Sequence, residues 1–335
     1  MDSINTLIAQ QSLDYEQSSA LFNQIMLGQL NDIELTAVLI ALKIKGESAQ
    51  EIAGAANAMR KNAKAFNTQG LHCVDSCGTG GDGANTINVS TTAAIVAAAC
   101  GLNVVKHGNR SVSSKSGSAD LLRTLGINLD MDSDIASKCL AQTGFTFLFA
   151  PNYHQGTKHA MAVRTTLKTR TIFNILGPLA NPAAPQTQLL GVYDPQLCAP
   201  MAQTLKTLGT ERAMVVHGAG TDEIALHGPT QVTELNQGEL TQYTLNAQDF
   251  GLENYSLADI AGDTPEYNAK ASLDILTGKG HVAHNAAIAV NVAALLVMEQ
   301  KADNFKVATE QVLEVLASGI AHEKLAQIVE VSNNA

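Results

Sequence analysis

From residue 72 onward, short apolar runs alternate with stretches of helical periodicity. The apolar runs are HCVD (72–75), NVVKH (103–107), FTFLFA (145–150), QLLGVY (188–193) and RAMVVHG (212–218). The helical stretches between them include 90–101, 115–126 and 196–208. Such alternation predicts an α/β domain, in which helices flank a mostly parallel central sheet.

The first seventy residues contain no such strand, and they predict a small N-terminal all-helical domain. Apolar residues recur at helical spacing, Asn31 or Asp32 is a candidate helix cap, and Ser48 with Glu51 forms a capping-box pattern. We expect a helical domain over residues 1–70 and an α/β domain over 71–335.

Three later features complete the predicted architecture. The segment 164–185 ends in a proline-rich turn and is expected to cross between the two domains. The runs EIALHG (223–228), TQVTEL (230–235) and LTQYTLN (240–246) predict a small antiparallel addition to the sheet. From about residue 268 to 333 the pattern is again helical.

Charge and cysteine content limit the class of protein. The formal net charge of −10 argues against a nucleic-acid-binding surface. The number of cysteines, five, is odd, and none of them forms a CxxC pair. We therefore expect neither a zinc site nor a disulfide framework, and we expect a cytoplasmic location. The N-terminus has no basic region followed by an apolar run, so we expect no signal peptide. No run approaches the roughly 18 apolar residues of a membrane span.

The stretch CGTGGDG (77–83) contains G-x-G-x-x-G at Gly78, Gly80 and Gly83. In a dinucleotide-binding unit, a helix follows the glycines directly and an acidic residue ends the next strand. Here ANTINVS intervenes before the helix, and the next strand ends in Lys106 and His107. This context excludes an NAD site and leaves an NADP site as an alternative.

The same glycine loop fits a phosphate site better. No Asp or Glu occurs between Asp82 and Asp120. Two loops, GTGGDGANTINVST and KHGNRSVSSKSGS, each follow a predicted strand and lead into a predicted helix. Loops of this kind meet at the carboxyl edge of a parallel sheet, where glycine amides and helix N-termini bind anions. They predict a ligand with more than one phosphate; the alternative is ordinary turns on a solvated basic face.

Five ordered motifs carry a resemblance to a known family. They are DSCGTGGDGANTINVST (75–91), KHGNRSVSSKSGSADLL (106–122), RTIFNILGPLANPA (170–183), GVYDP (191–195) and VVHGAGTDE (215–223). With them, the chain resembles the anthranilate phosphoribosyltransferases from about residue 4 to 300. The resemblance implies a small helical domain hinged to an α/β domain, as in type II nucleoside phosphorylases.

The resemblance also implies a reaction and its partners. Anthranilate would react with 5-phosphoribosyl 1-pyrophosphate (PRPP) to give N-(5-phosphoribosyl)anthranilate and pyrophosphate, a step of tryptophan biosynthesis. Two Mg²⁺ ions per active site are expected, as is a homodimer formed through the helical domain. Neither a nucleic acid nor a membrane is an expected partner.

The site residues that the resemblance implies fall into three groups. The residues expected to bind PRPP are Gly78, Gly81, Asp82, Thr86, Asn88, Val89, Ser90, Thr91, Lys106, His107, Gly108, Asn109, Arg110, Ser111, Val112, Ser113, Ser114 and Ser118. Those expected to contact anthranilate are Gly78, Asn109 and Arg164. Those expected to hold the metal are Ser90, Asp222 and Glu223. No general acid or base is identified.

Two other functions share parts of this pattern. A nucleoside phosphorylase of the same fold would take phosphate and a nucleoside, but the KHGNR loop argues against it. A catalytically silent relative that binds nucleic acid should lose the loop or the acidic pair, and this chain keeps both. Taken alone, Asp222–Glu223 also reads as a solvated turn and Arg164 as a surface helix residue.

Overall fold

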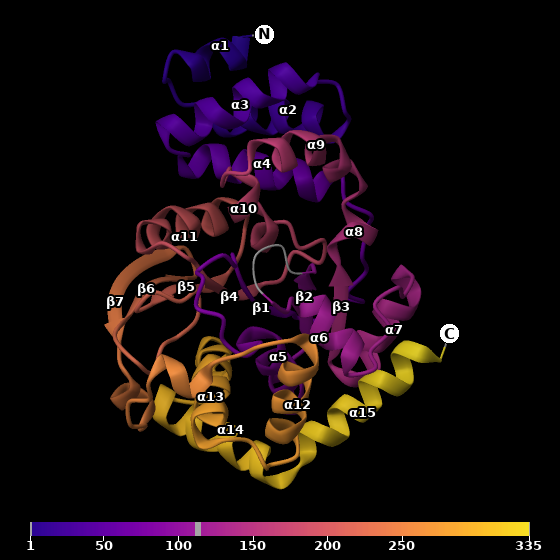
Figure 1. Ribbon diagram of the computed structural model, residues 1–335, viewed down its shortest axis with the longest axis vertical. Coiled ribbons are helices and arrows are strands. Elements are labelled where there is room, and N and C mark those ends of the chain that lie inside the picture. The colour runs from indigo at the N-terminus through magenta and orange to yellow at the C-terminus, as the bar shows by residue number, and fades with distance from the viewer. Residues whose placement is uncertain (1, 111–114, 335) are drawn as a thin grey trace.

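The computed structural model describes residues 2–110 and 115–334. Four helices pack together at the N-terminal end of the molecule (Figure 1). They are α1 (Asp2–Ile8), α2 (Tyr15–Met26), α3 (Asp32–Lys45) and α4 (Ala49–Lys61). The Asn31 side chain caps α3 by accepting from the amides of Ile33 and Glu34, and Ser48 with Glu51 forms a capping box on α4. The predicted helical region and both helix starts are confirmed.

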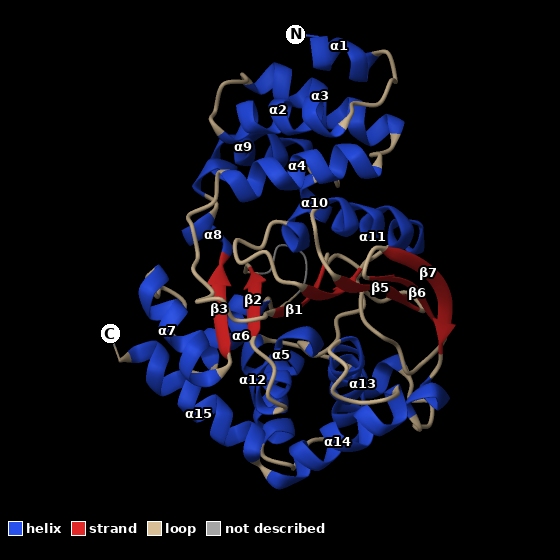
Figure 2. Cartoon of the chain, turned by 180° about the vertical axis from the view of Figure 1, so that it is seen from behind, coloured by secondary structure: helices blue, strands red, loops and turns tan. Residues whose placement is uncertain are grey.

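A segment from the middle of the chain returns to this bundle. It comprises the short helix α8 (Ala150–Tyr153), the 3-10 turn η1 (Gln155–Thr157) and α9 (Lys158–Leu167). Helix α9 contacts α2 and α3, and Figures 1 and 2 show it beside them. The chain then leads back to the sheet through α10 (Phe173–Leu176) and η2 (Gly177–Leu179).

The larger part of the molecule is built on a seven-stranded sheet of order β3-β2-β1-β4-β5-β6-β7. The first five strands pair in parallel, as predicted: β1 (Val74–Gly78), β2 (Val104–Gly108), β3 (Phe145–Phe149), β4 (Thr187–Gly191) and β5 (Arg212–Gly218). An antiparallel pair extends the sheet: β6 (Thr230–Asn236) and β7 (Glu239–Leu245).

One predicted strand is wrong. Residues 223–228, EIALHG, form no strand. Their amides bond to side chains instead: Ile224 N–H donates to Asn291 Oδ1 and Ala225 N–H to Thr230 Oγ1. The apolar side chains of this turn are buried in the core, which accounts for the misleading pattern.

Helices cover both faces of the sheet. On one side lie α5 (Val89–Ala99), α12 (Pro265–Leu276), α13 (Val282–Met298), α14 (Phe305–Ser318) and α15 (Ile320–Asn333). The other side is covered by α11 (Cys198–Thr207), which lies on β5 and β6, and by the helical bundle (Figure 2). The remaining elements are α6 (Ser118–Thr124), α7 (Ser133–Thr143), η3 (Pro195–Leu197), η4 (Ala247–Phe250) and η5 (Leu257–Ile260).

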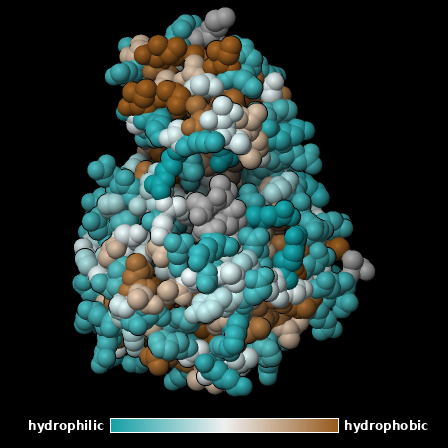
Figure 3. Space-filling view, viewed as in Figure 1, coloured by the Kyte–Doolittle hydropathy of each residue, from teal (hydrophilic) through white to brown (hydrophobic). Residues whose placement is uncertain are grey.

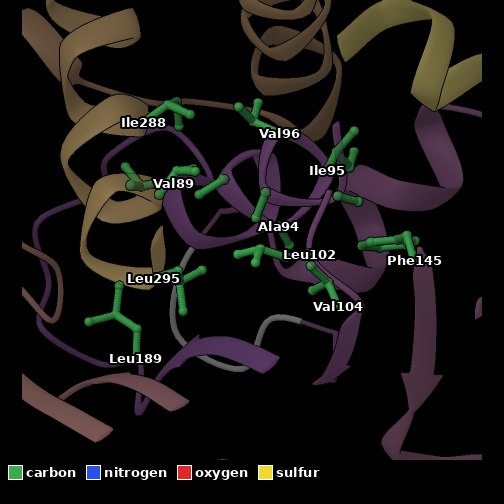
Figure 4. Close-up of a cluster of buried hydrophobic side chains, with 14 of the residues drawn as sticks. Val89, Ala94, Ile95, Val96, Leu102, Val104, Phe145, Leu189, Ile288 and Leu295 are labelled. Carbon is green, nitrogen blue, oxygen red and sulfur yellow. The ribbon is translucent and has the colours of Figure 1, made fainter. Parts of the chain in front are cut away.

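The main core lies between the sheet and the helices α5 and α13 (Figure 4). Small residues such as Ala94 on α5 let these helices approach each other and the sheet, where Ile95, Leu189 and Ile288 are buried. Across the described residues, no helix combines the length and the apolar character that crossing a membrane requires. Most residues of the apolar helix α13 are buried, so it is a core helix.

Candidate functional site

The parallel strands end at the edge of the sheet that faces the helical bundle. Figure 2 shows the arrowheads of β2 and β3 pointing toward α8 and α9. Both candidate phosphate loops leave this edge, one after β1 at Gly78 and one after β2 at Gly108. The first loop leads into α5 and the second into α6, as the sequence predicts.

The glycine loop after β1 is in direct contact with Asp222. The Gly80 N–H donates to Asp222 Oδ2 at 2.6 Å. The Asp222 N–H in turn donates to Asp82 Oδ2 at 3.3 Å. A Cβ atom on Gly78 would lie 2.3 Å from Asp222 Oδ2, so the strand end must be glycine for the carboxylate to reach the loop. The two motifs therefore form one site.

The N-terminus of α5 brings together the three residues expected to hold a metal. The Ser90 N–H donates to Glu223 Oε1 at 3.2 Å, and Asp222 is the neighbour of Glu223 in the chain. The buried Lys106 ammonium donates to the Ser76 carbonyl at 2.6 Å and to Ser90 Oγ at 3.4 Å. These contacts place an ammonium group, a hydroxyl and the Glu223 carboxylate at one helix end, with the Asp222 carboxylate against the neighbouring glycine loop.

Burial dominates the electrostatics of the acidic pair. It raises the pKa of Asp222, and the nearby Asp82 carboxylate raises it further. Burial and the Asp222 charge likewise raise the pKa of Glu223. A positive charge placed between them would therefore lower both pKa values and stabilise the ionised forms.

The residues fit magnesium in kind. Within residues 2–110 and 115–334, no group of three or more His, Cys, Asp or Glu side chains has the arrangement of a metal cage. Magnesium takes oxygen ligands and is commonly held by one or two carboxylates together with water and substrate phosphates. Asp222, Glu223 and the Ser90 hydroxyl provide that kind of partial shell.

The second loop is joined to the first at its far end. Thr91 Oγ1 donates to Ser118 Oγ at 3.0 Å, which links the starts of α5 and α6. The exposed Asn109 accepts from the Arg110 N–H at 2.8 Å, and the Arg110 guanidinium lies 5.5 Å from the centre of the Phe149 ring. The residues Ser111, Val112, Ser113 and Ser114 lie outside the described residues.

His107 is placed differently from the other loop residues. Its buried Nδ1 lies 3.2 Å from the Gly177 carbonyl, which can only accept, so Nδ1 carries the proton. The His107 ring packs edge-on against the His154 ring at 5.0 Å. Burial lowers the pKa of His107 to about 3 and that of His154 to about 4, so both are neutral at pH 7. The His107 side chain thus faces α8 and η2 rather than solvent.

Arg164 lies on α9, at the bundle side of the site. Its guanidinium lies 5.0 Å from the centre of the Phe173 ring, and burial lowers its pKa. Among the described residues, no ion pair involves this side chain. An unpaired guanidinium beside an aromatic ring suits a ligand that has both a carboxylate and a flat ring.

Sequence reasoning assigned no role to three residues that hold the site. Arg170 donates to the Gly81 carbonyl and stacks on the Tyr193 ring at 4.0 Å, while Lys43 of the bundle donates to the Arg170 carbonyl at 3.0 Å. The buried Asn181 donates to Asp75 Oδ2 at 2.9 Å. The third is Asn268, which donates to Asn88 Oδ1 at 2.9 Å. For Arg170 and Asn181, the only signal in the sequence is that they belong to the motif RTIFNILGPLANPA (170–183).

Two domain models of a glycosyl transferase family match most of the chain. Residues 1–63 match its helical bundle domain, and residues 70–322 match its a/b domain. A curated relative, the anthranilate phosphoribosyltransferase of Pseudoalteromonas translucida, is 66% identical over 330 residues, which cover 98% of this chain and 93% of the relative.

Solved structures agree with the sequence comparison. The crystal structure of the anthranilate phosphoribosyltransferase from Thermus thermophilus is 38% identical and superposes with a TM-score of 0.94, covering 99% of each chain. The Saccharomyces cerevisiae enzyme in complex with PRPP and Mg is 30% identical with a TM-score of 0.89, covering 100% of this chain and 98% of its own. Another structure of the yeast enzyme contains 4-fluoroanthranilate.

Proposed function

The chain belongs to the anthranilate phosphoribosyltransferase family, and on that premise we propose how its residues divide the reaction between them. The reaction transfers the 5-phosphoribosyl group of PRPP to the amine of anthranilate and releases pyrophosphate, in tryptophan biosynthesis. The observation that carries the assignment is the contact between Gly80 and Asp222, which joins the glycine loop to the acidic pair. Family membership does not favour a dinucleotide enzyme, a phosphorylase or a silent nucleic-acid binder.

We assign the two loops to PRPP. Backbone amides of the glycine loop and of the α5 N-terminus would bind its phosphates, and Lys106 would add positive charge from beneath. The exposed Arg110 and the half-buried Ser118 lie on the second loop and at the start of α6. Apart from His107, whose side chain packs against His154, the described residues expected to bind PRPP lie on or beside the two loops that leave one sheet edge, which supports the assignment.

We assign Arg164, with Asn109 and Gly78, to anthranilate. The Arg164 guanidinium would bind the carboxylate in bidentate fashion, with Phe173 as the apolar surface beneath it. The aryl amine of anthranilate is neutral and nucleophilic at pH 7, so the reaction needs no strong base. The amine forms a bond to C1 of the ribose, the bond from C1 to pyrophosphate breaks, and the amine proton passes to solvent.

We assign magnesium to Ser90, Asp222 and Glu223, and we propose two ions per site. When bound, magnesium would neutralise the charge that develops on the departing pyrophosphate. The chain's own contribution is positioning: Lys106 orders Ser90, the Ser90 amide holds Glu223, and Gly80 holds Asp222. Catalysis would come mainly from this positioning.

The assignment is tested by separating the two substrates kinetically. Loss of a charge-assisted hydrogen bond is worth about 1.5–3 kcal/mol, so Arg164→Ala should raise the KM for anthranilate roughly tenfold to a hundredfold. The same variant should leave the KM for PRPP nearly unchanged. Ser118→Ala should show the reverse pattern. If Arg164→Ala raised the PRPP constant instead, the anthranilate assignment would be wrong.

We propose that the protein is a homodimer formed through the helical bundle. Apolar surface gathers over the α1 and α3 end of the bundle (Figure 3). Exposed isoleucines lie on these helices: Ile8, Ile33 and Ile44 are 61%, 83% and 70% exposed. Sedimentation of the purified chain should give twice its mass, and Ile33→Lys with Ile44→Lys should give the monomer. A wild-type monomer at micromolar concentration would contradict this proposal.

Two further assignments stay with this proposal. We divide the chain at residue 70 into domains 1–70 and 71–335, joined again by the crossing segment 164–185; the contacts of α9 with α2 and α3 support such a second connection. We also place the enzyme in the cytoplasm. All five cysteines are described and free, as a reducing compartment would leave them.

A further inference from the structure

The side chain at the start of α5 does not cap its own helix. Asn88 is the N-cap residue, yet it makes no side-chain hydrogen bond to the first turn. An asparagine at this position usually accepts from the second or third amide of its helix. Asn88 Oδ1 instead accepts from Asn268 Nδ2 at 2.9 Å and from Ser116 Oγ at 3.0 Å, and its Nδ2 donates to the Ser116 carbonyl at 3.1 Å.

Asn268 lies in the first turn of α12 and is 2% exposed. Both ends of its amide are engaged. Its Nδ2 donates to Asn88, 180 residues away in the chain, and its Oδ1 accepts from the Asp263 N–H at 2.9 Å. Because the amide accepts on one side and donates on the other, its orientation is fixed, and with it the orientation of the Asn88 side chain.

The backbone just before Asn268 pairs with the glycine loop. We call residues 260–268 the strap. The Ile87 N–H donates to the Ile260 carbonyl at 3.0 Å, and the Gly262 N–H donates to the Asn85 carbonyl at 2.7 Å. A Cβ atom on Gly262 would lie 2.2 Å from the Thr86 carbonyl oxygen, so this approach requires glycine. The strap therefore contacts the backbone of the first loop, and its last residue, Asn268, contacts Asn88 at the end of that loop.

The strap also reaches the second loop. Asp263 pairs with Lys115 at 2.6 Å, although both side chains are exposed and such a pair contributes little to stability. The stronger link passes through the amide of Asn88, which the buried Ser116 contacts twice. The strap thus contacts both phosphate loops, although it lies more than 140 residues further along the chain.

We propose that Asn268 is a positioning residue for PRPP. It holds the Asn88 amide between the two loops, where that amide bonds to Ser116 of the second loop. Without the Asn268 donor, the Asn88 side chain loses its fixed orientation and the two loops lose this link, so the groups that would bind the phosphates are less well positioned. This inference rests on the assignment of the two loops to PRPP.

The test compares Asn268→Ala with Ser272→Ala in the full-length enzyme. Ser272 lies one turn further along α12, is 1% exposed, and bonds to Thr92 of α5 at 2.8 Å. Each variant loses a side-chain hydrogen bond that joins α12 to α5 or to its N-cap residue Asn88, so both should lower the melting temperature. Only Asn268→Ala should raise the KM for PRPP, by about tenfold, the equivalent of about 1.4 kcal/mol. The KM for anthranilate should change less than twofold.

The cycle with Asn88→Ala distinguishes this inference from the site assignment. Asn88→Ala alone should raise the KM for PRPP, and adding Asn268→Ala should raise it no further, since both act through one side chain. Fully additive effects would overturn the positioning role, as would equal PRPP constants for Asn268→Ala and Ser272→Ala. If Asn88→Ala left the PRPP constant unchanged, the loop assignment would itself be wrong.

Discussion

The carboxylate of Asp222 lies 2.6 Å from the backbone nitrogen of Gly80, across 142 residues of sequence. This hydrogen bond joins the glycine loop after β1 to the turn after β5. The glycine loop that would bind a phosphate and the carboxylate that would hold a metal are therefore in contact. A substitution that moves one of them should also move the other.

Replacing Asp222 by Asn should separate the metal role from the shape of the site. The amide oxygen can still accept from Gly80, but it carries no charge and is a weaker magnesium ligand. We expect kcat/KM to fall about a hundredfold, and the magnesium concentration for half-maximal rate to rise. Initial rates over a magnesium series measure both. Asp274→Asn is the control, because the Asp274 side chain pairs with Lys270 on the surface of α12; an equal loss there would contradict the metal role.

Gly78→Ala should damage the same contact sterically. The added Cβ would lie 2.3 Å from Asp222 Oδ2, so the carboxylate or the loop must move. We expect about a tenfold weaker PRPP affinity and a melting temperature lower by several degrees, as for an overpacked site. Equilibrium titration with PRPP and thermal melting are the measurements. Gly177→Ala is the steric control, since a Cβ there meets nothing within 4 Å.

Arg170→Ala should loosen the other side of the glycine loop. The side chain donates to the Gly81 carbonyl and stacks on Tyr193, two contacts that are each worth about 1 kcal/mol at a partly exposed site. We expect the KM for PRPP to rise about fivefold to tenfold. Arg123→Ala, which removes a surface pair with Asp130, should leave it unchanged. Equal constants for the two variants would exclude a role for Arg170 in holding the loop.

The buried His154 should make the enzyme less stable in acid. In the unfolded chain a histidine takes up a proton below about pH 6.5, whereas burial lowers the folded pKa of His154 to about 4. Between these values the unfolded state binds the extra proton, so stability is full above pH 6.5 and falls as the pH drops. Melting curves from pH 7.5 to 4.5 should therefore fall less steeply for His154→Gln than for the wild type. Parallel curves would show that His154 is not responsible.

Much of the fold follows from local patterns. The five parallel strands occur where β-type apolar runs meet turn residues, and Asn31 and Ser48 start their helices through side chains next to them in sequence. The misassigned run at 223–228 shows the limit of such patterns. Its apolar residues are buried in a turn whose amides bond to the side chains of Asn291 and Thr230. The spacing of apolar residues in the sequence cannot indicate those partners.

The site was predictable where one motif carries its own chemistry. The two loops and the acidic pair could be found from glycine, hydroxyl and charge patterns, and the resemblance supplied their roles. The residues that support them were not predictable, because Arg170, Asn181 and Asn268 act through contacts made only after folding. An asparagine in a helix has no local signal that it will fix a loop 180 residues away.

The most direct test of the central claim follows anthranilate fluorescence after the purified protein is mixed with PRPP, with and without magnesium. The account predicts a loss of fluorescence that requires both PRPP and magnesium, with pyrophosphate released in equal amount. Anthranilate that persists with every divalent metal, in a protein that is folded and binds PRPP, would contradict the transferase assignment and point to another acceptor.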